Sequence, residues 1–175
     1  NQVFTQLAGK EISYNNIVDI DGAIALMSEF KDSKPAFAII KHTNPCGVAL
    51  RDTVKEAWDA ALACDPTSAF GGIIICNKAI DAETASAIDD IFYEVLIAPG
   101  YEAGVVDMLK KKKNRILLEL HSFEPAVEQQ KSMLGGTLVQ DADFAPVENE
   151  TLNQVTKKGI PAEKRADLIF GIKCV

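Results

Sequence analysis

Four short apolar runs, separated by segments with helical spacing, constrain the fold of this chain more than any other feature. The runs lie at residues 36–40, 73–76, 94–98 and 115–120. Their apolar side chains are too continuous for half-exposed strands, which is typical of strands covered on both faces. Since strand and helix patterns alternate through 36–120, we predict a three-layer α/β domain with helices on both faces of a central sheet.

The remaining elements follow from spacing and from start signals. A run at 135–140 predicts a further strand, which gives a sheet of about five strands. Thr53 is a candidate N-cap, and Asp81 opens a helix with an acidic first turn. Helices are predicted at residues 19–30, from about 53 to 63, from 81 onward, 102–112 and 162–173. Buried strand positions are predicted at Ile39, Ile73, Ile75, Leu96, Ile97, Leu117 and Leu138.

Length and composition bound the organisation. The chain has 175 residues, enough for one domain with an appendage. Residues 142–159 are polar and irregular, so we predict a domain at 1–145 and a polar segment with a helix at 146–175. Both ends are expected to be cut from something longer, because the sequence opens on Asn1 and closes directly after an amphipathic run.

Charge and cysteine usage narrow the class of partner. The net charge is −7, and only three of the 18 basic residues are arginines, so no basic face for nucleic acid is expected. No apolar run approaches the roughly 20 residues of a membrane helix, and no signal peptide is recognisable. The four cysteines form no CxxC motif. We therefore expect a reduced, cytoplasmic protein with a small-molecule ligand.

The segment from Lys41 to Gly47, with the sequence KHTNPCG, is the strongest candidate for a site. It follows the run at 36–40, which we interpret as a buried parallel strand. Such strand ends carry ligands in open α/β sheets, and Asn-Pro and Cys-Gly predict a tight turn with a close backbone approach. A histidine can accept a proton from an amine, and a neighbouring lysine can stabilise developing negative charge. The alternative, two polar residues that cap a strand, is outweighed narrowly.

A zinc site is not expected here. Cys46 follows a proline, as in the zinc deaminases, but those enzymes also need H-x-E and a second cysteine two residues further on. Thr43-Asn44 follows the histidine and Val48-Ala49 stands in place of the second cysteine. We interpret Cys46 as a small packed residue and predict no metal.

Two further positions are open on sequence alone. Gly71-Gly72 follows the turn at 65–68. These glycines either only allow the backbone to turn or let backbone amides approach a flat or anionic ligand. Glu94 begins a strand and is either solvated or bound to donors of a ligand.

Five segments together resemble a known family. They are SYNN at 13–16, KHTNPCGVA from 41, DPTSAFGG from 65, IAPGY from 97 and GGTLVQD from 135. In this order and at similar intervals, they resemble the bifunctional purine biosynthesis proteins, which join AICAR formyltransferase to IMP cyclohydrolase. The resemblance runs over nearly the whole chain and lies in the formyltransferase part.

The resemblance implies a fold and a division of the enzyme. The family's formyltransferase region contains two subdomains that are similar to cytidine deaminase in fold and lack its zinc. This chain looks like the first of them, without the cyclohydrolase domain and the second subdomain. The implied substrates are AICAR and 10-formyltetrahydrofolate, and the full-length enzyme is expected to be a homodimer.

The resemblance also implies residue roles. The family's Lys-His pair falls on Lys41 and His42, so that His42 would accept the proton of the 5-amino group and Lys41 would stabilise the transition state. Gly71 and Glu94 match positions that contact AICAR, and Asn16 matches an asparagine near the nucleotide. A different class of function also stays open: a non-catalytic nucleotide-binding or interaction module on the same scaffold.

Overall fold

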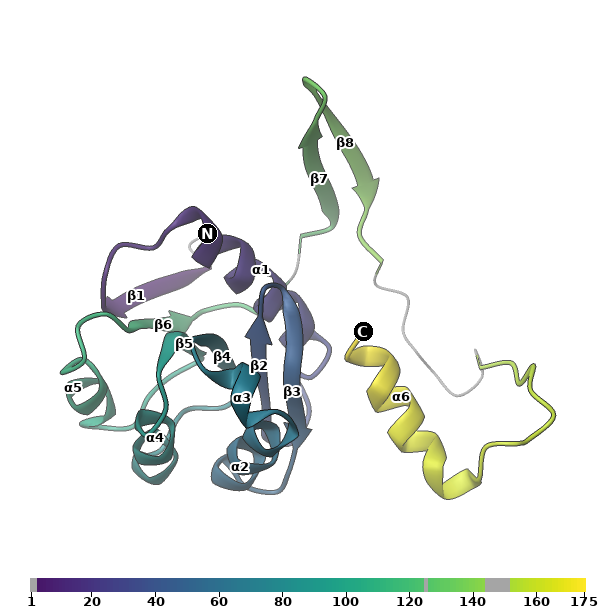
Figure 1. Ribbon diagram of the computed structural model, residues 1–175, viewed down its shortest axis with the longest axis horizontal. Helices are drawn as coiled ribbons and strands as arrows, with labels where there is room; N and C mark the ends of the chain where they lie inside the picture. The colour runs from purple at the N-terminus through teal and green to yellow at the C-terminus, as the bar shows by residue number, and fades with distance from the viewer. Residues whose placement is uncertain (1–2, 125, 144–151) are drawn as a thin grey trace. The chain divides into compact units, whose positions relative to one another are not determined.

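The computed structural model describes residues 3–124, 126–143 and 152–175. Its core is a mixed six-stranded sheet in the order β1-β6-β5-β4-β2-β3 (Figure 1). β4, β5 and β6 are parallel, whereas β1, β2 and β3 pair antiparallel with their neighbours. The strands are β1 (Phe4–Ala8), β2 (Ala36–Lys41), β3 (Asn44–Leu50), β4 (Gly72–Cys76), β5 (Tyr93–Ala98) and β6 (Ile116–Leu120).

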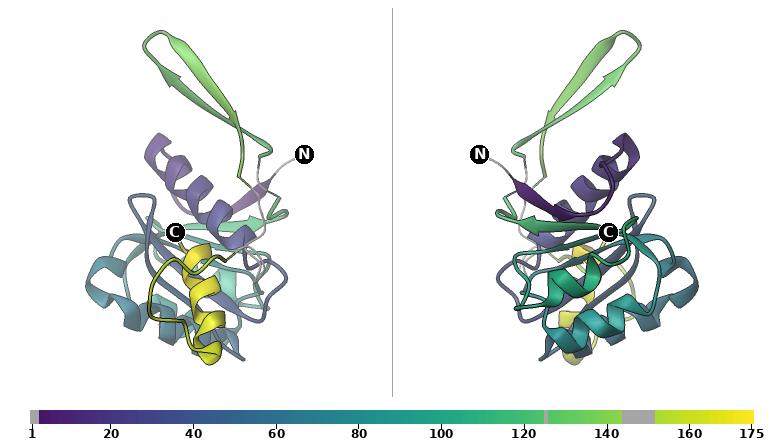
Figure 2. Two further views of the ribbon diagram at one scale, coloured as in Figure 1. Left: turned by 90° about the vertical axis from the view of Figure 1, so that its right-hand side faces the viewer. Right: turned by 90° about the vertical axis from the view of Figure 1, so that its left-hand side faces the viewer.

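Helices cover both faces of the sheet, as predicted. α1 (Tyr14–Ser28) packs against β2, β4 and β5, and the opposite face carries α2 (Val54–Cys64), α4 (Ala82–Asp89) and α5 (Val105–Leu109) (Figures 1 and 2). Between α2 and β4 lies the single turn α3 (Pro66–Ala69). The result is a three-layer α/β arrangement.

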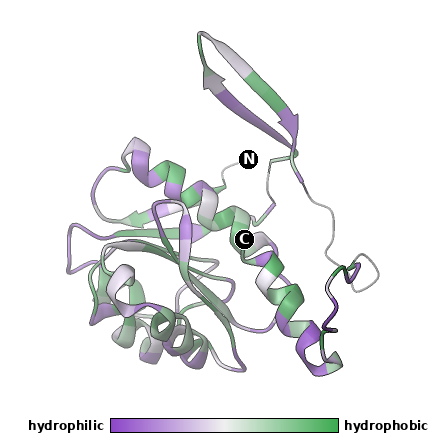
Figure 3. Ribbon diagram, turned by 45° about the vertical axis from the view of Figure 1, so that its right-hand side comes forward, coloured by the Kyte–Doolittle hydropathy of each residue, from purple (hydrophilic) through white to green (hydrophobic). Residues whose placement is uncertain are grey.

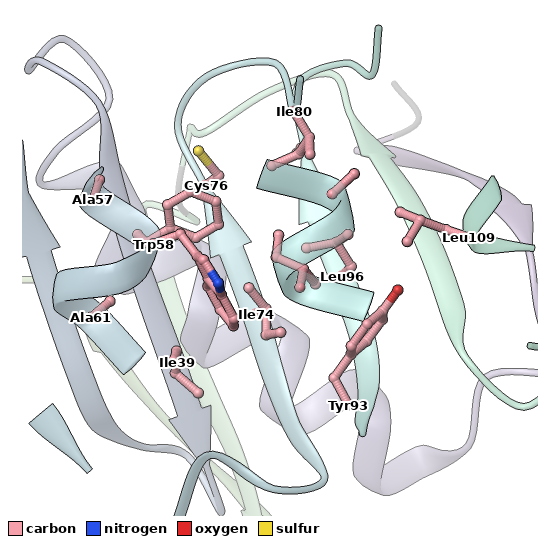
Figure 4. Packing of buried hydrophobic residues seen from close by; sticks show 14 of the residues in the cluster. Ile39, Ala57, Trp58, Ala61, Ile74, Cys76, Ile80, Tyr93, Leu96 and Leu109 are labelled. Atoms are coloured by element: carbon pink, nitrogen blue, oxygen red, sulfur yellow. The ribbon is translucent and has the colours of Figure 1, made fainter. Parts of the chain in front are cut away.

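Successive side chains of a strand point to opposite faces of the sheet, so each central strand contributes to the core on both faces. On the α2 side, Ile39, Ile74 and Leu96 belong to one buried cluster with Trp58 of α2 (Figure 4). Trp58 also meets Phe37 edge-on, with ring centroids 5.6 Å apart. The intervening residues, which include Ile40, Ile73, Ile75 and Ile97, are also apolar and buried, and the central strands are mostly green in Figure 3. Six predicted buried positions are confirmed at 2% exposure or less: Ile39, Ile73, Ile75, Leu96, Ile97 and Leu117.

Side-chain caps set the starts of three helices. Ser13 and Thr53 each form a capping box with the residue three positions on, and Asp81 caps α4. The predicted starts at Thr53 and Asp81 are confirmed. The helix predicted at 19–30 begins five residues earlier, at Tyr14, because the Ser13 side chain satisfies one of its first free N–H groups, that of Asn16.

The residues after Glu124 form a second compact unit. It contains a hairpin of β7 (Glu128–Met133) and β8 (Gly136–Asp141), then the 3₁₀ turn Ala162–Lys164 and α6 (Arg165–Lys173). The strand predicted at 135–140 is therefore present, but it pairs only with β7 among the described strands. Leu138, predicted to be buried, is 57% exposed. The proposed domain limits at 145 and 146 stay a prediction, since residues 144–151 lie outside the described ones.

Two features of the sheet differ from the prediction. The sheet has six strands, of which β1 and β3 were not predicted and form its two edges. β2 is antiparallel to both of its neighbours, not parallel. An apolar run shows that a strand is buried but does not encode the direction of strands that are distant in sequence.

Candidate functional site

A cleft of about 720 Å³ lies in the first unit, where the end of β2 meets the starts of α1, β4 and β5. Register explains this meeting point, because Ile40 of β2 lies opposite Ile73, and Gly72 lies opposite Tyr93. The carboxyl end of β2 therefore lies beside the amino ends of two parallel strands. All five predicted site residues line this cleft: Asn16, Lys41, His42, Gly71 and Glu94.

His42 stands in a strained two-residue turn between β2 and β3. Its φ angle is 52° and that of Thr43 is 63°, while Lys41 pairs with Asn44 across the hairpin. Two successive left-handed residues are the signature of a type I′ hairpin turn, which is unusual for a β-branched threonine. The backbone N–H of Thr43 donates to Asp19 of α1 over 2.9 Å, which holds the turn against the helix. The backbone that places His42 in the cleft is therefore both strained and held in position.

The tight turn was predicted at Asn-Pro, but this position is wrong: Asn44-Pro45 is the first part of β3, and the turn lies just before it. Pairing shifts between Ile39 and Ile40, so that Cys46 forms a bulge after Pro45 on an edge strand, where a proline is tolerated. The close backbone approach is confirmed at Gly47. A Cβ there would lie 2.1 Å from the carbonyl oxygen of Ala61 in α2.

Lys41 is held by the loop that precedes β4. Its Nζ donates to the carbonyl oxygen of Phe70 over 2.7 Å. Gly71, the next residue, has φ +70°, and a Cβ there would lie 3.1 Å from the same Nζ. Its backbone N–H donates to the carbonyl of Phe92 over 2.8 Å, which ties the loop to the start of β5. Glycine at 71 therefore serves both a left-handed backbone and the space that the ammonium needs.

Glu94 is held from the α1 side. Asn16, which is 4% exposed, donates from Nδ2 to Glu94 Oε2 over 2.8 Å. Lys10 Nζ lies 3.7 Å from the same oxygen. The Glu94 side chain keeps 37% of its surface exposed, so its carboxylate lines the same cleft as Lys41 and His42.

The lining residues that sequence reasoning did not select include two that interact with each other. Asp19 and Thr43 both line the cleft and bond to each other. Asp19 stands three positions after Asn16 on α1, a spacing that places both residues on one helical face. That spacing was a usable signal, but it becomes visible only once the helix start is placed at Tyr14.

The described residues contain neither a cluster of potential metal ligands nor a helix that could span a membrane. No cluster of three or more His, Cys, Asp or Glu in that part of the chain could hold a metal ion. Burial raises the pKa of the Cys46 thiol, which fits its interpretation as a packed residue. No described helix is both long enough and apolar enough to cross a membrane.

Comparison with known proteins identifies the family. The family model described as AICARFT/IMPCHase bienzyme matches residues 1–175. Relatives named bifunctional purine biosynthesis protein PurH include those of Chlorobium phaeobacteroides (strain BS1), 50% identical over 98% of this chain, and Ruegeria pomeroyi, 48% identical over 96%. A third, from Bacteroides thetaiotaomicron, is 46% identical over 99%. The chain spans about a third of the length of each relative. It belongs to the AICARFT/IMPCHase bienzyme family.

Proposed function

We propose that this chain supplies one wall of an AICAR formyltransferase site in an enzyme of purine biosynthesis. The reaction transfers the formyl group of 10-formyltetrahydrofolate to the 5-amino group of AICAR. The observation that carries the proposal is the convergence of Lys41, His42, Gly71, Glu94 and Asn16, which span residues 16–94, on one cleft. A shared cleft is what a common ligand requires.

The cleft has the groups that this chemistry needs. The 5-amino nitrogen attacks the formyl carbon and the carbonyl oxygen gains negative charge. The bond from that carbon to N10 of the folate then breaks, and tetrahydrofolate leaves with a proton on N10. The attacking nitrogen must lose a proton. His42 accepts that proton as general base. Lys41, whose Nζ is held in place by the Phe70 carbonyl, stabilises the developing charge without having to reorganise.

The other wall residues hold the nucleotide. Glu94 accepts N–H groups of the AICAR amine or carboxamide, and Asn16 supports it over 2.8 Å. Gly71 lets the ligand approach the backbone where a larger residue would press on Lys41. The proposed roles divide the cleft into a catalytic pair on β2 and the adjacent turn, and a binding side on α1, β5 and the loop before β4.

The rest of the enzyme belongs to the same proposal. We infer a cytidine-deaminase-like fold of the scaffold without zinc, a second subdomain that closes the site, and an IMP cyclohydrolase domain elsewhere in the protein. The complete enzyme is proposed to be a cytoplasmic homodimer. A non-catalytic nucleotide-binding or interaction module is the alternative, and it predicts AICAR binding without formyl transfer.

Formyl transfer should be assayed in a reconstituted enzyme, defined as the Chlorobium phaeobacteroides relative in which this chain replaces the segment that it matches. The unmodified relative is assayed alongside. His42→Asn is the preferred variant, because asparagine tolerates the left-handed backbone at this position while lacking a base. Turnover should fall about 10²–10⁴-fold, with AICAR affinity largely unchanged.

The second histidine of the chain provides the control. His121 bonds to Thr5 Oγ1 over 2.7 Å and does not line the cleft, so His121→Asn should leave turnover near normal. Lys41→Ala should lower turnover more than affinity. Near-normal turnover in His42→Asn would refute the role of His42 as general base. A reconstituted enzyme that elutes and melts like the relative but transfers no formyl group would refute the proposed reaction.

A further inference from the structure

Asn16 is the central residue of a short hydrogen-bond chain that ends at Glu94. The hydroxyl of Ser13 donates to Asn16 Oδ1 over 2.9 Å, and the Ser13 backbone N–H donates to the same oxygen over 3.3 Å. The Asn16 backbone N–H returns a bond of 3.2 Å to Ser13 Oγ. The side chains of Ser13, Asn16 and Glu94 thus form one chain from the N-cap of α1 to the start of β5.

This chain determines the orientation of the Asn16 amide. A backbone N–H can only donate, so the atom of Asn16 that faces it must be the oxygen. The amide nitrogen then points to Glu94 and donates to it. A flipped amide would place two donors together at Ser13 and two acceptors together at Glu94.

The arrangement uses only one oxygen of the Glu94 carboxylate. Asn16 Nδ2 and Lys10 Nζ both approach Oε2, at 2.8 Å and 3.7 Å. Within the described part of the chain, Oε1 accepts no hydrogen bond. Since Glu94 lines the cleft, Oε1 is the atom that a ligand N–H can reach.

We propose that Ser13 is a positioning residue for AICAR binding, acting through Asn16 on Glu94. By holding the Asn16 oxygen, the Ser13 hydroxyl keeps Asn16 Nδ2 on Glu94 Oε2 and leaves Oε1 turned to the N–H donors of the aminoimidazole carboxamide. The inference rests on the proposed function, because it takes AICAR as the ligand of the cleft. It adds a residue for which the family resemblance implies no role.

Ser13→Gly separates positioning from helix capping. Glycine is an acceptable N-cap but has no hydroxyl to hold the amide, whereas Ser13→Thr keeps the hydroxyl. In the reconstituted enzyme, Ser13→Gly should raise KM for AICAR about 5- to 10-fold with kcat nearly unchanged, since a binding contact common to ground and transition state is weakened. Ser13→Thr should restore KM to within about twofold.

Thr53→Gly is the matched control. Thr53 forms the same capping box with Glu56 at the start of α2, with both bonds at 3.2 Å, and does not line the cleft. It should change stability as Ser13→Gly does and leave KM for AICAR unchanged. An equal KM change in the two variants would show a general effect of helix capping and would overturn the inference.

Calorimetric titration with AICAR alone separates failure of this inference from failure of the proposed function. If the reconstituted enzyme binds AICAR without turnover, the proposed reaction is wrong. A larger Kd for AICAR in Ser13→Gly would still support the positioning role. If the enzyme is active and Ser13→Gly keeps the normal KM and Kd, the positioning role is wrong. Absence of any AICAR binding would overturn both.

Discussion

Gly71→Ala should damage the site through two separable effects. The backbone at Gly71 is left-handed, with φ +70°, and an alanine there costs about 1–2 kcal/mol of stability. The new Cβ would also lie 3.1 Å from Lys41 Nζ. A lysine end can move aside at small cost in stability, but it then loses its 2.7 Å bond to the Phe70 carbonyl. We therefore expect little further destabilisation, and a displaced ammonium.

Gly104→Ala isolates the first effect from the second. Gly104 has φ +83°, and no heavy atom lies within 4 Å of its Cβ position. Both variants should lower the melting temperature by about 2–8 °C, which corresponds to 1–2 kcal/mol for a chain of this size. Denaturant titration of the 175-residue chain measures the loss in free energy of unfolding directly.

Only Gly71→Ala should slow formyl transfer. Displacing a catalytic group by about 1 Å costs roughly 10²-fold, and a smaller shift of Lys41 should cost about 10-fold or more. The measurement is kcat in the reconstituted enzyme, with Gly104→Ala beside it. Equal kcat in the two variants would refute the argument, because it would mean that the space at residue 71 does not determine the position of Lys41.

Three further predictions concern the chain by itself. Gly47→Ala should destabilise it by about 3 kcal/mol in denaturant titration, because the new Cβ meets the Ala61 backbone at 2.1 Å; a loss below about 1 kcal/mol would contradict this packing. Burial raises the pKa of the Cys76 thiol to about 12. At pH 8 a thiol reagent should therefore modify exposed Cys64 and reach Cys76 only after unfolding. Rapid labelling of Cys76 in the native protein would show that Cys76 is not buried. The isolated chain should fold, by circular dichroism, yet transfer no formyl group, since one wall cannot hold two reactants in register; measurable turnover by the chain alone would contradict that division of the site.

Local sequence determined the buried strands and two helix starts. Isoleucine runs such as 73–75 are apolar on both faces, so they can only be covered from both sides, and the structure buries them completely or nearly so. Thr53 and Asp81 each satisfy one of the first N–H groups of their own helix, an interaction within four residues that needs no tertiary partner. The five candidate site residues also follow from the sequence alone, from motif resemblance together with local chemistry.

Only the tertiary structure decided the direction of β2, the edge strands and the geometry of the turn. Strand pairing depends on partners that are distant in sequence, so the run at 36–40 could not reveal that β2 is antiparallel to β4. Asn-Pro predicts a turn locally, but pairing with β2 and the bond from the Thr43 N–H to Asp19 place the turn at His42 and Thr43. Leu138 shows the converse, because an apolar residue in a strand pattern is buried only if another layer covers it, and Leu138 is 57% exposed.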